Sequence, residues 1–258
     1  MRWLLLLAAL AAAGPRIAAA QPRMPPQAVA QPRSGTQDMS RELQAMQADD
    51  SANPGMLWVQ EGEALFHRAE GRVQKACADC HASLTGVAAR YPAWDDRSAA
   101  PMDLAGRIQH CRTEHQQATP LAREGEPLLA LSAFVAGQSR GLPLAPPEDS
   151  RLAPALARGE ALFRQRRGQL NLSCAQCHED RAGLRLGSAL IPEGHANGYP
   201  QYRLEWQALG SLQRRLRNCM VGVRATAPAF GAAEYVEIEL YLARRGAGLA
   251  VEAPAVRP

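Results

Sequence analysis

One cysteine–histidine motif occurs twice in this chain. Residues 77–81 read C-A-D-C-H and residues 174–178 read C-A-Q-C-H, 97 positions further on. In a C-x-x-C-H segment the two thiols can form thioethers with one haem, and the histidine that follows can bind its iron. The repeated motif therefore predicts two covalently bound haem c groups. The predicted attachment and iron-binding residues are Cys77, Cys80 and His81 at the first site and Cys174, Cys177 and His178 at the second.

Two further cysteines, Cys111 and Cys219, lie outside the motifs, and each follows an arginine by four positions. They could form a disulfide with one another, as exported proteins commonly do, or belong to a four-cysteine zinc site. A third interpretation makes each of them the second axial ligand of a haem iron, where a class I cytochrome c supplies methionine. Their parallel placement favours this third interpretation. Rival ligands at a comparable depth, none with a counterpart in the other half, are Met102, Met220, His110, His115 and His195.

The motifs belong to a larger repeat of helical segments. Residues 62–66 and 159–163 both read G-E-A-L-F, and each begins an amphipathic stretch ahead of its motif. Residues 128–136 and 236–243 have apolar side chains at helical spacing and close the two copies. Pro- and Gly-rich loops separate these segments, and no strand-like alternation accompanies them. The sequence therefore predicts an all-α fold of two tandem class I cytochrome c-like domains related by internal duplication.

Composition along the chain suggests where these domains begin and end. Residues 1–20 have a positive start, a short apolar core and a small-residue cleavage site, which predicts a signal peptide and export to the periplasm. No later run is apolar enough for a membrane span. The remaining divisions that we expect are a flexible leader at 21–53, a first domain at 54–140, a proline-rich linker at 141–150 and a second domain at 151–258.

Positive charge gathers around the second spare cysteine. Residues 203–224 contain five arginines and a single glutamate, which indicates a site for a small anion or an acidic partner. Arg215 lies one helical turn before Cys219 and could present paired donors to an oxyanion, and Arg224 is a second candidate. Nucleic acid is a poor alternative, because the chain is predicted to be exported and has no basic motif interleaved with aromatics.

Thiolate ligation bears on function. An anionic sulfur ligand stabilises ferric iron and lowers its reduction potential, so a cytochrome that only shuttles electrons would gain little from two such ligands. The residues thus predict a haem protein that acts on a small anionic sulfur compound. The alternative is a non-catalytic dihaem electron-transfer cytochrome of a periplasmic oxidoreductase.

From about Leu57 onward, the chain resembles the SoxA subunits of the SoxAX L-cysteine S-thiosulfotransferases. The resemblance rests on the two C-x-x-C-H motifs followed by Arg-x-x-x-Cys-x-x-x-x-Arg-Ala at residues 215–225, with Cys111–Glu114, Gln138–Gly141 and Gly187–Leu204 in support. It implies that His81 pairs with Cys111 on the first iron and His178 with Cys219 on the second. It also implies that Cys219 is catalytic, in the family also as a persulfide, and that Arg215 binds substrate.

The same resemblance implies the reaction and the partners. The substrate would be thiosulfate, conjugated oxidatively to a cysteine of SoxY in the SoxYZ carrier protein. The two electrons would pass to a SoxX-like small cytochrome c subunit, with which the chain forms a heterodimer, and onward to a soluble cytochrome c.

Overall fold

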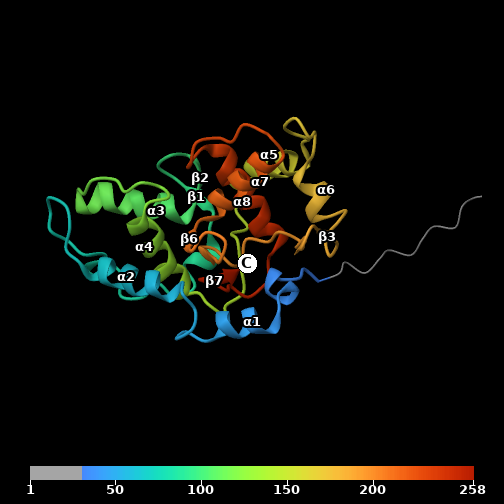
Figure 1. The fold of residues 1–258 in the computed structure, drawn as a ribbon. Coiled ribbons are helices and arrows are strands. Elements are labelled where there is room, and N and C mark those ends of the chain that lie inside the picture. The colour runs from blue at the N-terminus through green and yellow to red at the C-terminus, as the bar shows by residue number, and fades with distance from the viewer. Residues whose placement is uncertain (1–30) are drawn as a thin grey trace, which may run out of the picture. The chain divides into compact units, whose positions relative to one another are not determined.

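The computed structural model describes residues 31–258 of the chain (Figure 1). The predicted signal peptide and the start of the predicted leader lie outside these residues. The helices of the described part are α1 (Arg41–Ala48), α2 (Met56–His67), α3 (Leu104–Cys111), α4 (Glu126–Gly137), α5 (Ala153–Arg164), α6 (Cys174–His178), α7 (Leu212–Gly222) and α8 (Ala233–Arg245). The strands are β1 (Ala93–Asp95), β2 (Ala100–Met102), β3 (Arg185–Leu186), β4 (Ala189–Leu190), β5 (Gln201–Arg203), β6 (Ala208–Gly210) and β7 (Ala255–Arg257).

Two helix pairs organise the fold, and a glycine lies where the helices of each pair cross. Helix α2 packs on α4, and α5 packs on α8. A Cβ atom added to Gly62 would lie 2.0 Å from the carbonyl oxygen of Ala130, and one added to Gly159 would lie 2.1 Å from that of Glu237. Only glycine permits so close an approach of two backbones. The repeated G-E-A-L-F segments therefore specify equivalent helix crossings.

Short strands supplement the helices, so the all-α prediction is incomplete. Strands β1 and β2 pair antiparallel, as do β3 and β4, and β5 lies between antiparallel β6 and parallel β7. Each has only two or three residues, too few for an alternating pattern to be recognised in the sequence. The pairing of β5 with β7 also joins segments that are about fifty positions apart, which no local pattern can predict.

The second half of the chain follows the first with a change of spacing. Helix α5 and the second haem motif lie 97 positions after their counterparts, whereas β5, β6 and the start of α7 lie 108 positions after β1, β2 and α3. The additional residues of the second half lie between His178 and Tyr199, in the segment that contains the β3–β4 hairpin. The hairpin thus has no counterpart in the first half.

The stretch before α2 differs from the flexible leader that the composition suggested. From Ser34 onward it forms a 3-10 turn and α1, and α1 contacts β7 near the C-terminus. The Asn53 side chain is buried and donates a hydrogen bond of 2.9 Å to the carbonyl oxygen of Pro254. Polar side chains hold this stretch in place, and a search for apolar periodicity does not detect such anchoring.

Residues 32–258 form one compact unit in which side chains of the two halves interlock. Leu129 and Ala133 of α4 pack with Tyr202 and Leu209 of the second half in a shared core. Gln213 also donates a hydrogen bond of 2.8 Å to Asp103 across the same boundary. Among residues 31–258, no helix combines the length and the apolarity that crossing a membrane requires.

Candidate functional site

The second haem motif forms a short helix whose first turn contains both cysteines. Ser173 caps α6: its Oγ accepts a hydrogen bond of 3.3 Å from the backbone N–H of Gln176, and the Gln176 side chain accepts one of 2.9 Å from the N–H of Ser173. This reciprocal capping box fixes the start of the helix. Cys174 and Cys177 are thereby held on one turn, as thioether attachment to a single haem requires.

A backbone carbonyl group holds the ring of His178 in position through its Nδ1 atom. Its Nδ1 lies 2.7 Å from the carbonyl oxygen of Pro192, and a carbonyl can only accept, so Nδ1 carries the proton. Nε2 is therefore the nitrogen through which this imidazole could bind iron. Gly194 lies against the ring, because a Cβ at that position would lie 2.9 Å from Nδ1.

Cys219 lies beside this imidazole on α7, with a half-buried thiol. Burial alone would raise the pKa of Cys219. Hydrogen bonding to His178, together with the positive charges of Arg215 and Arg203, outweighs burial and lowers the pKa of Cys219 below its ordinary value. The surroundings of Cys219 thus favour the thiolate, which is the form in which a cysteine binds metals and acts as a nucleophile.

Arg215 differs from the other arginines of its cluster. Its guanidinium makes no side-chain hydrogen bond and no ion pair within residues 31–258, although it influences the pKa of Cys219. Arg214 stacks on Trp206, and Arg217 donates to the carbonyl oxygen of Pro228. Arg215 is therefore the arginine of α7 that is available to an anion near the thiol.

Arg224 lies elsewhere. It follows α7 in a left-handed backbone conformation, with φ of 58°, and its side chain reaches Gln169. With Arg167 it lines a shallow pocket that does not include Cys219. The structure thus brings Arg215, but not Arg224, to the thiol.

The first haem motif is arranged in parallel but is less tightly held. Residues 77–79 form a 3-10 turn, and Asp79 accepts a hydrogen bond of 2.9 Å from the N–H of Ala76. Cys111, the last residue of α3, is close enough to Cys77 and Cys80 for their charges to interact. Burial raises the pKa of Cys111, with only Arg107 opposing it. His81 is exposed, and its ring has no hydrogen bond to any residue of the described chain.

The competing interpretations of the spare cysteines can be compared with these positions. All six cysteines are free, and Cys111 and Cys219 each lie beside their own motif rather than beside one another. Among the rival ligands, Met220 is buried in the α5–α8 core. His195 pairs through Nε2 with Glu193 at 2.8 Å. His110 lies near Arg97, at 3.4 Å.

The surroundings of both motifs suit a porphyrin. Partly buried apolar side chains gather beside Cys174, where Leu212, Leu216, Ala196 and Phe230 border the α5–α8 core. A similar set of residues borders the core beside Cys77, namely Leu84, Val87, Leu104, Ile108 and Leu121. A covalent haem needs apolar side chains around its ring, two thiols for the thioether bonds and an imidazole nitrogen for the iron. Each motif, with its surroundings, contains these groups.

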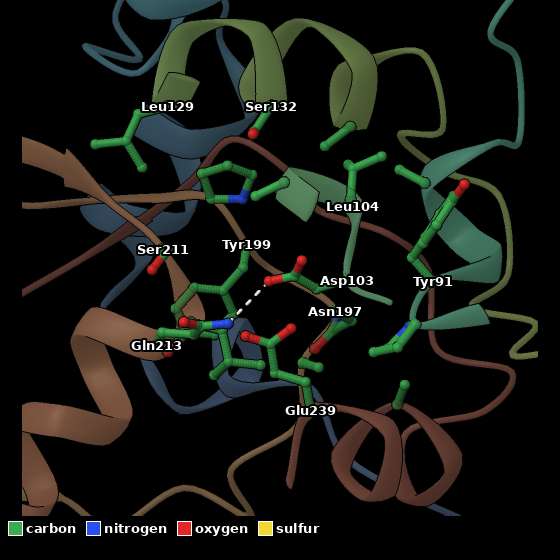
Figure 2. Close-up of a pocket in the computed structure, with 18 of the residues that line it drawn as sticks. Tyr91, Asp103, Leu104, Leu129, Ser132, Asn197, Tyr199, Ser211, Gln213 and Glu239 are labelled. Atoms are coloured by element: carbon green, nitrogen blue, oxygen red, sulfur yellow. Dashed lines mark hydrogen bonds between the residues drawn. The ribbon is translucent and has the colours of Figure 1, made fainter. Parts of the chain in front are cut away.

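A cavity of about 120 Å³ lies between the two halves (Figure 2). Asp103, Gln213 and Glu239 converge on it, and Tyr91 and Tyr199 line it from the first and second halves respectively. Burial, reinforced by the charge of Asp103, raises the pKa of Glu239 well above its ordinary value. The sequence does not single out this carboxyl, because Glu239 is one of two glutamates in the helical segment at residues 236–243.

The sequence analysis also assigned no role to Tyr199 and none individually to Arg203. Burial raises the pKa of Tyr199 to about 12 against the opposing charge of Arg215, so its hydroxyl lies near that arginine and stays protonated. A signal for this residue was present in the chain, because Tyr-Pro occurs at 91–92 and again at 199–200.

Comparison with known proteins agrees with this site. The family model described as SoxA/TsdA, cytochrome c domain, matches residues 61–144 and again residues 158–251. An L-cysteine S-thiosulfotransferase subunit SoxA from Pseudaminobacter salicylatoxidans is 38% identical over 84% of this chain and 77% of its own length. The corresponding subunit of Rhodovulum sulfidophilum is 36% identical over 87% of this chain and 80% of its own.

Structure comparison gives the same result. The crystal structure of SoxXA from P. pantotrophus matches with a TM-score of 0.85 and 30% identity, over 88% of this chain and 87% of the matched one. A cytochrome c domain binds haem c covalently, as the two C-x-x-C-H motifs predict. The chain therefore belongs to the SoxA/TsdA family of c-type cytochromes, together with the SoxA subunits that it resembles.

Proposed function

We propose that this chain is the catalytic SoxA subunit of an L-cysteine S-thiosulfotransferase, which joins thiosulfate oxidatively to a cysteine of a carrier protein. The observation that carries the proposal is the thiol of Cys219, which lies beside the imidazole of His178 and in the field of an Arg215 guanidinium with no partner among residues 31–258. The names of the relatives from P. salicylatoxidans and R. sulfidophilum support the activity.

The proposal includes two haems, one at each motif, in two tandem cytochrome c-like domains. Cys77 and Cys80 would hold the first, and Cys174 and Cys177 the second. The axial pairs would be His81 with Cys111 and His178 with Cys219. When bound, each iron accepts or releases one electron, which is the chemistry that an oxidative conjugation needs.

The chain's own residues supply binding and the nucleophile. Arg215 binds the sulfonate oxygens of thiosulfate through its planar fork. The Cys219 thiolate bonds to the outer sulfur to give Cys219–S–S–SO₃⁻, and this step releases two electrons. A carrier thiolate then attacks the outer sulfur by thiol–disulfide exchange, takes the S–SO₃⁻ group and restores the Cys219 thiolate. If Cys219 is a persulfide, its outer sulfur would take the place of the cysteine sulfur in these steps.

The partners follow from this electron balance. A SoxX-like small cytochrome c subunit would receive the electrons within a heterodimer, and a soluble cytochrome c would accept them next. The solved SoxXA complex supports the first of these partners. The SoxY cysteine of a SoxYZ carrier would be the second substrate, and the signal peptide proposed at residues 1–20 would direct the reaction to the periplasm.

The test is the Cys219→Ala variant, assayed with its small cytochrome subunit and the carrier protein. We expect thiosulfate-dependent turnover to disappear while intact mass still shows the same number of covalent haems as the wild type. Peptide mass spectrometry should also find extra sulfur on the Cys219 peptide of the wild type after exposure to thiosulfate. Undiminished turnover in the variant would contradict the proposal and favour the non-catalytic electron-transfer cytochrome.

A further inference from the structure

The two halves present nearly the same framework around their spare cysteines. Each has a Tyr-Pro pair, two short antiparallel strands and a capped helix, with arginine one turn before the cysteine. The strand registers correspond as well, since Asp95 pairs with Ala100 and Arg203 pairs with Ala208. Residue differences within this shared framework therefore indicate what distinguishes one site from the other.

In the first half the arginine is neutralised. Arg107 forms an ion pair of 2.6 Å with Asp95, which is only 4% exposed and also accepts hydrogen bonds from the backbone and hydroxyl of Ser98. Tyr91 is a further hydrogen-bonding neighbour of Arg107. The charge of the guanidinium beside Cys111 is thus balanced by a carboxylate of the protein itself.

In the second half the carboxylate is replaced by a second guanidinium. Arg203 occupies the strand position of Asp95, and its side chain is only 13% exposed. Burial, together with the charge of Arg215, lowers the pKa of Arg203, so the two guanidinium groups are close enough to repel each other. Glu205, which is half exposed, offsets part of the charge through a contact of 2.8 Å with Arg203 Nε.

Two partly buried cations beside one thiol are costly unless an anion joins them. The pair Arg107–Asp95 carries no net charge, whereas Arg215, Arg203 and the half-exposed Glu205 together carry one net positive charge. The protonated hydroxyl of Tyr199 lies near both arginines and adds a neutral donor. This combination suits a compact dianion with several oxygens, because each guanidinium can donate two parallel hydrogen bonds.

We propose that Arg203 is a second anchor for the sulfonate group of thiosulfate, acting with Arg215, and that Asp95 at the equivalent position prevents the Cys111 site from binding the anion. This inference rests on the proposed function for the identity of the substrate. The anion pocket itself rests only on the residues described above.

The test transplants the first-half residue into the second half. Arg203→Asp and Arg203→Ala are assayed in the complex with the small cytochrome subunit, with Arg215→Ala as a benchmark and Arg41→Asp as a matched charge control on exposed α1. We expect the KM for thiosulfate to rise roughly tenfold in Arg203→Ala and roughly a hundredfold in Arg203→Asp, with little change in Arg41→Asp.

A second variant guards against misfolding of Arg203→Asp. Glu205→Gln leaves Arg203 in place and removes its partner, so we expect a two- to threefold lower KM for thiosulfate. A purely structural role for the Arg203–Glu205 contact predicts no such gain. An unchanged KM in both Arg203→Asp and Glu205→Gln would overturn the inference.

A further readout separates this inference from the proposed function. Alkylation of Cys219 is followed by peptide mass spectrometry with anionic iodoacetate and with neutral iodoacetamide. We expect the wild type to favour iodoacetate and Arg203→Asp to reverse the preference, whether or not thiosulfate is turned over. The absence of any preference in the wild type would contradict the anion pair even if the transferase activity is present.

Discussion

At the scale of single residues, the two spare cysteines show how neighbouring charges distinguish similar sites. Both follow an arginine by one helical turn. Burial raises the pKa of Cys111, whereas contacts with His178 and the two nearby arginines lower that of Cys219. The thiolate, which is the form that nucleophilic attack requires, is consequently more favoured at Cys219 than at Cys111.

The Arg107–Asp95 pair should contribute to stability in a pH-dependent way. Bonds from Ser98, followed by those from Arg107, lower the pKa of Asp95 to about 2. A depressed pKa contributes stability above the unfolded value of 3.8, and this contribution is lost as the pH falls through about 2. We therefore expect Asp95→Asn to unfold more easily at pH 7, by about 1–2 kcal/mol.

Urea unfolding at pH 7 and at pH 3 tests this expectation. The difference between the variant and the wild type should narrow at the lower pH. Ser98→Ala is a useful comparison, because it removes a hydroxyl donor while the carboxylate stays paired with Arg107. A difference that stays constant over this range would indicate that the Asp95 charge is not the cause.

At the scale of elements, the repeated glycines control the helix crossings. We expect Gly62→Ala and Gly159→Ala each to lower the free energy of unfolding by about 1–3 kcal/mol, because the added methyl would overlap a backbone carbonyl. Gly137→Ala is the matched control, since a Cβ there meets nothing within 4 Å and α4 should gain slightly in propensity. Equal stability of all three variants in urea unfolding would contradict the close crossing.

Sequence reasoning predicted the elements that have a strong local pattern. The 3.6-residue periodicity indicated the helices that became α2, α4, α5 and α8, whereas the short helix α6 at the second haem motif was not predicted. Asp95 and Arg203 were not compared, although the offset of 108 positions that relates Cys111 to Cys219 also relates these two residues. The strand registers are what show that they occupy equivalent places in the fold.

The ordered stretch before α2 was missed for a different reason. Ser34 and Asn53 are buried polar residues whose partners, Glu252 and Pro254, lie about two hundred positions away. Composition alone cannot reveal such long-range hydrogen bonds. The contacts of the polar residues in this stretch are therefore apparent only in the folded chain.

At the scale of the whole molecule, the cavity between the halves contains a carboxyl group with a raised pKa. Glu239 faces Asp103, Glu124, Arg123 and Gln213, and burial raises its pKa. A raised pKa contributes stability below the unfolded value of 4.5, and this stability is lost as the pH rises through the folded value. We expect Glu239→Gln to be more stable than the wild type at pH 8, by about 1–3 kcal/mol.

The same comparison at pH 4.5 should give a smaller difference, because the wild-type carboxyl is then protonated in the folded state. Glu234→Gln, at the exposed start of α8, controls for the loss of one carboxylate. Lower stability of Glu239→Gln at both pH values would mean that the carboxyl makes a contact that the amide cannot replace.

The parallel pairing of β5 with β7 has a consequence for the order of events during synthesis. Ribosomes deliver the chain from its N-terminus, so β5, which bears Arg203, emerges about fifty residues before β7. Until β7 has been made, one edge of β5 has no strand to pair with. The strand that bears Arg203 is therefore completed only by the last strand of the chain. A chain interrupted before residue 255 would already have both haem motifs yet lack a finished substrate pocket.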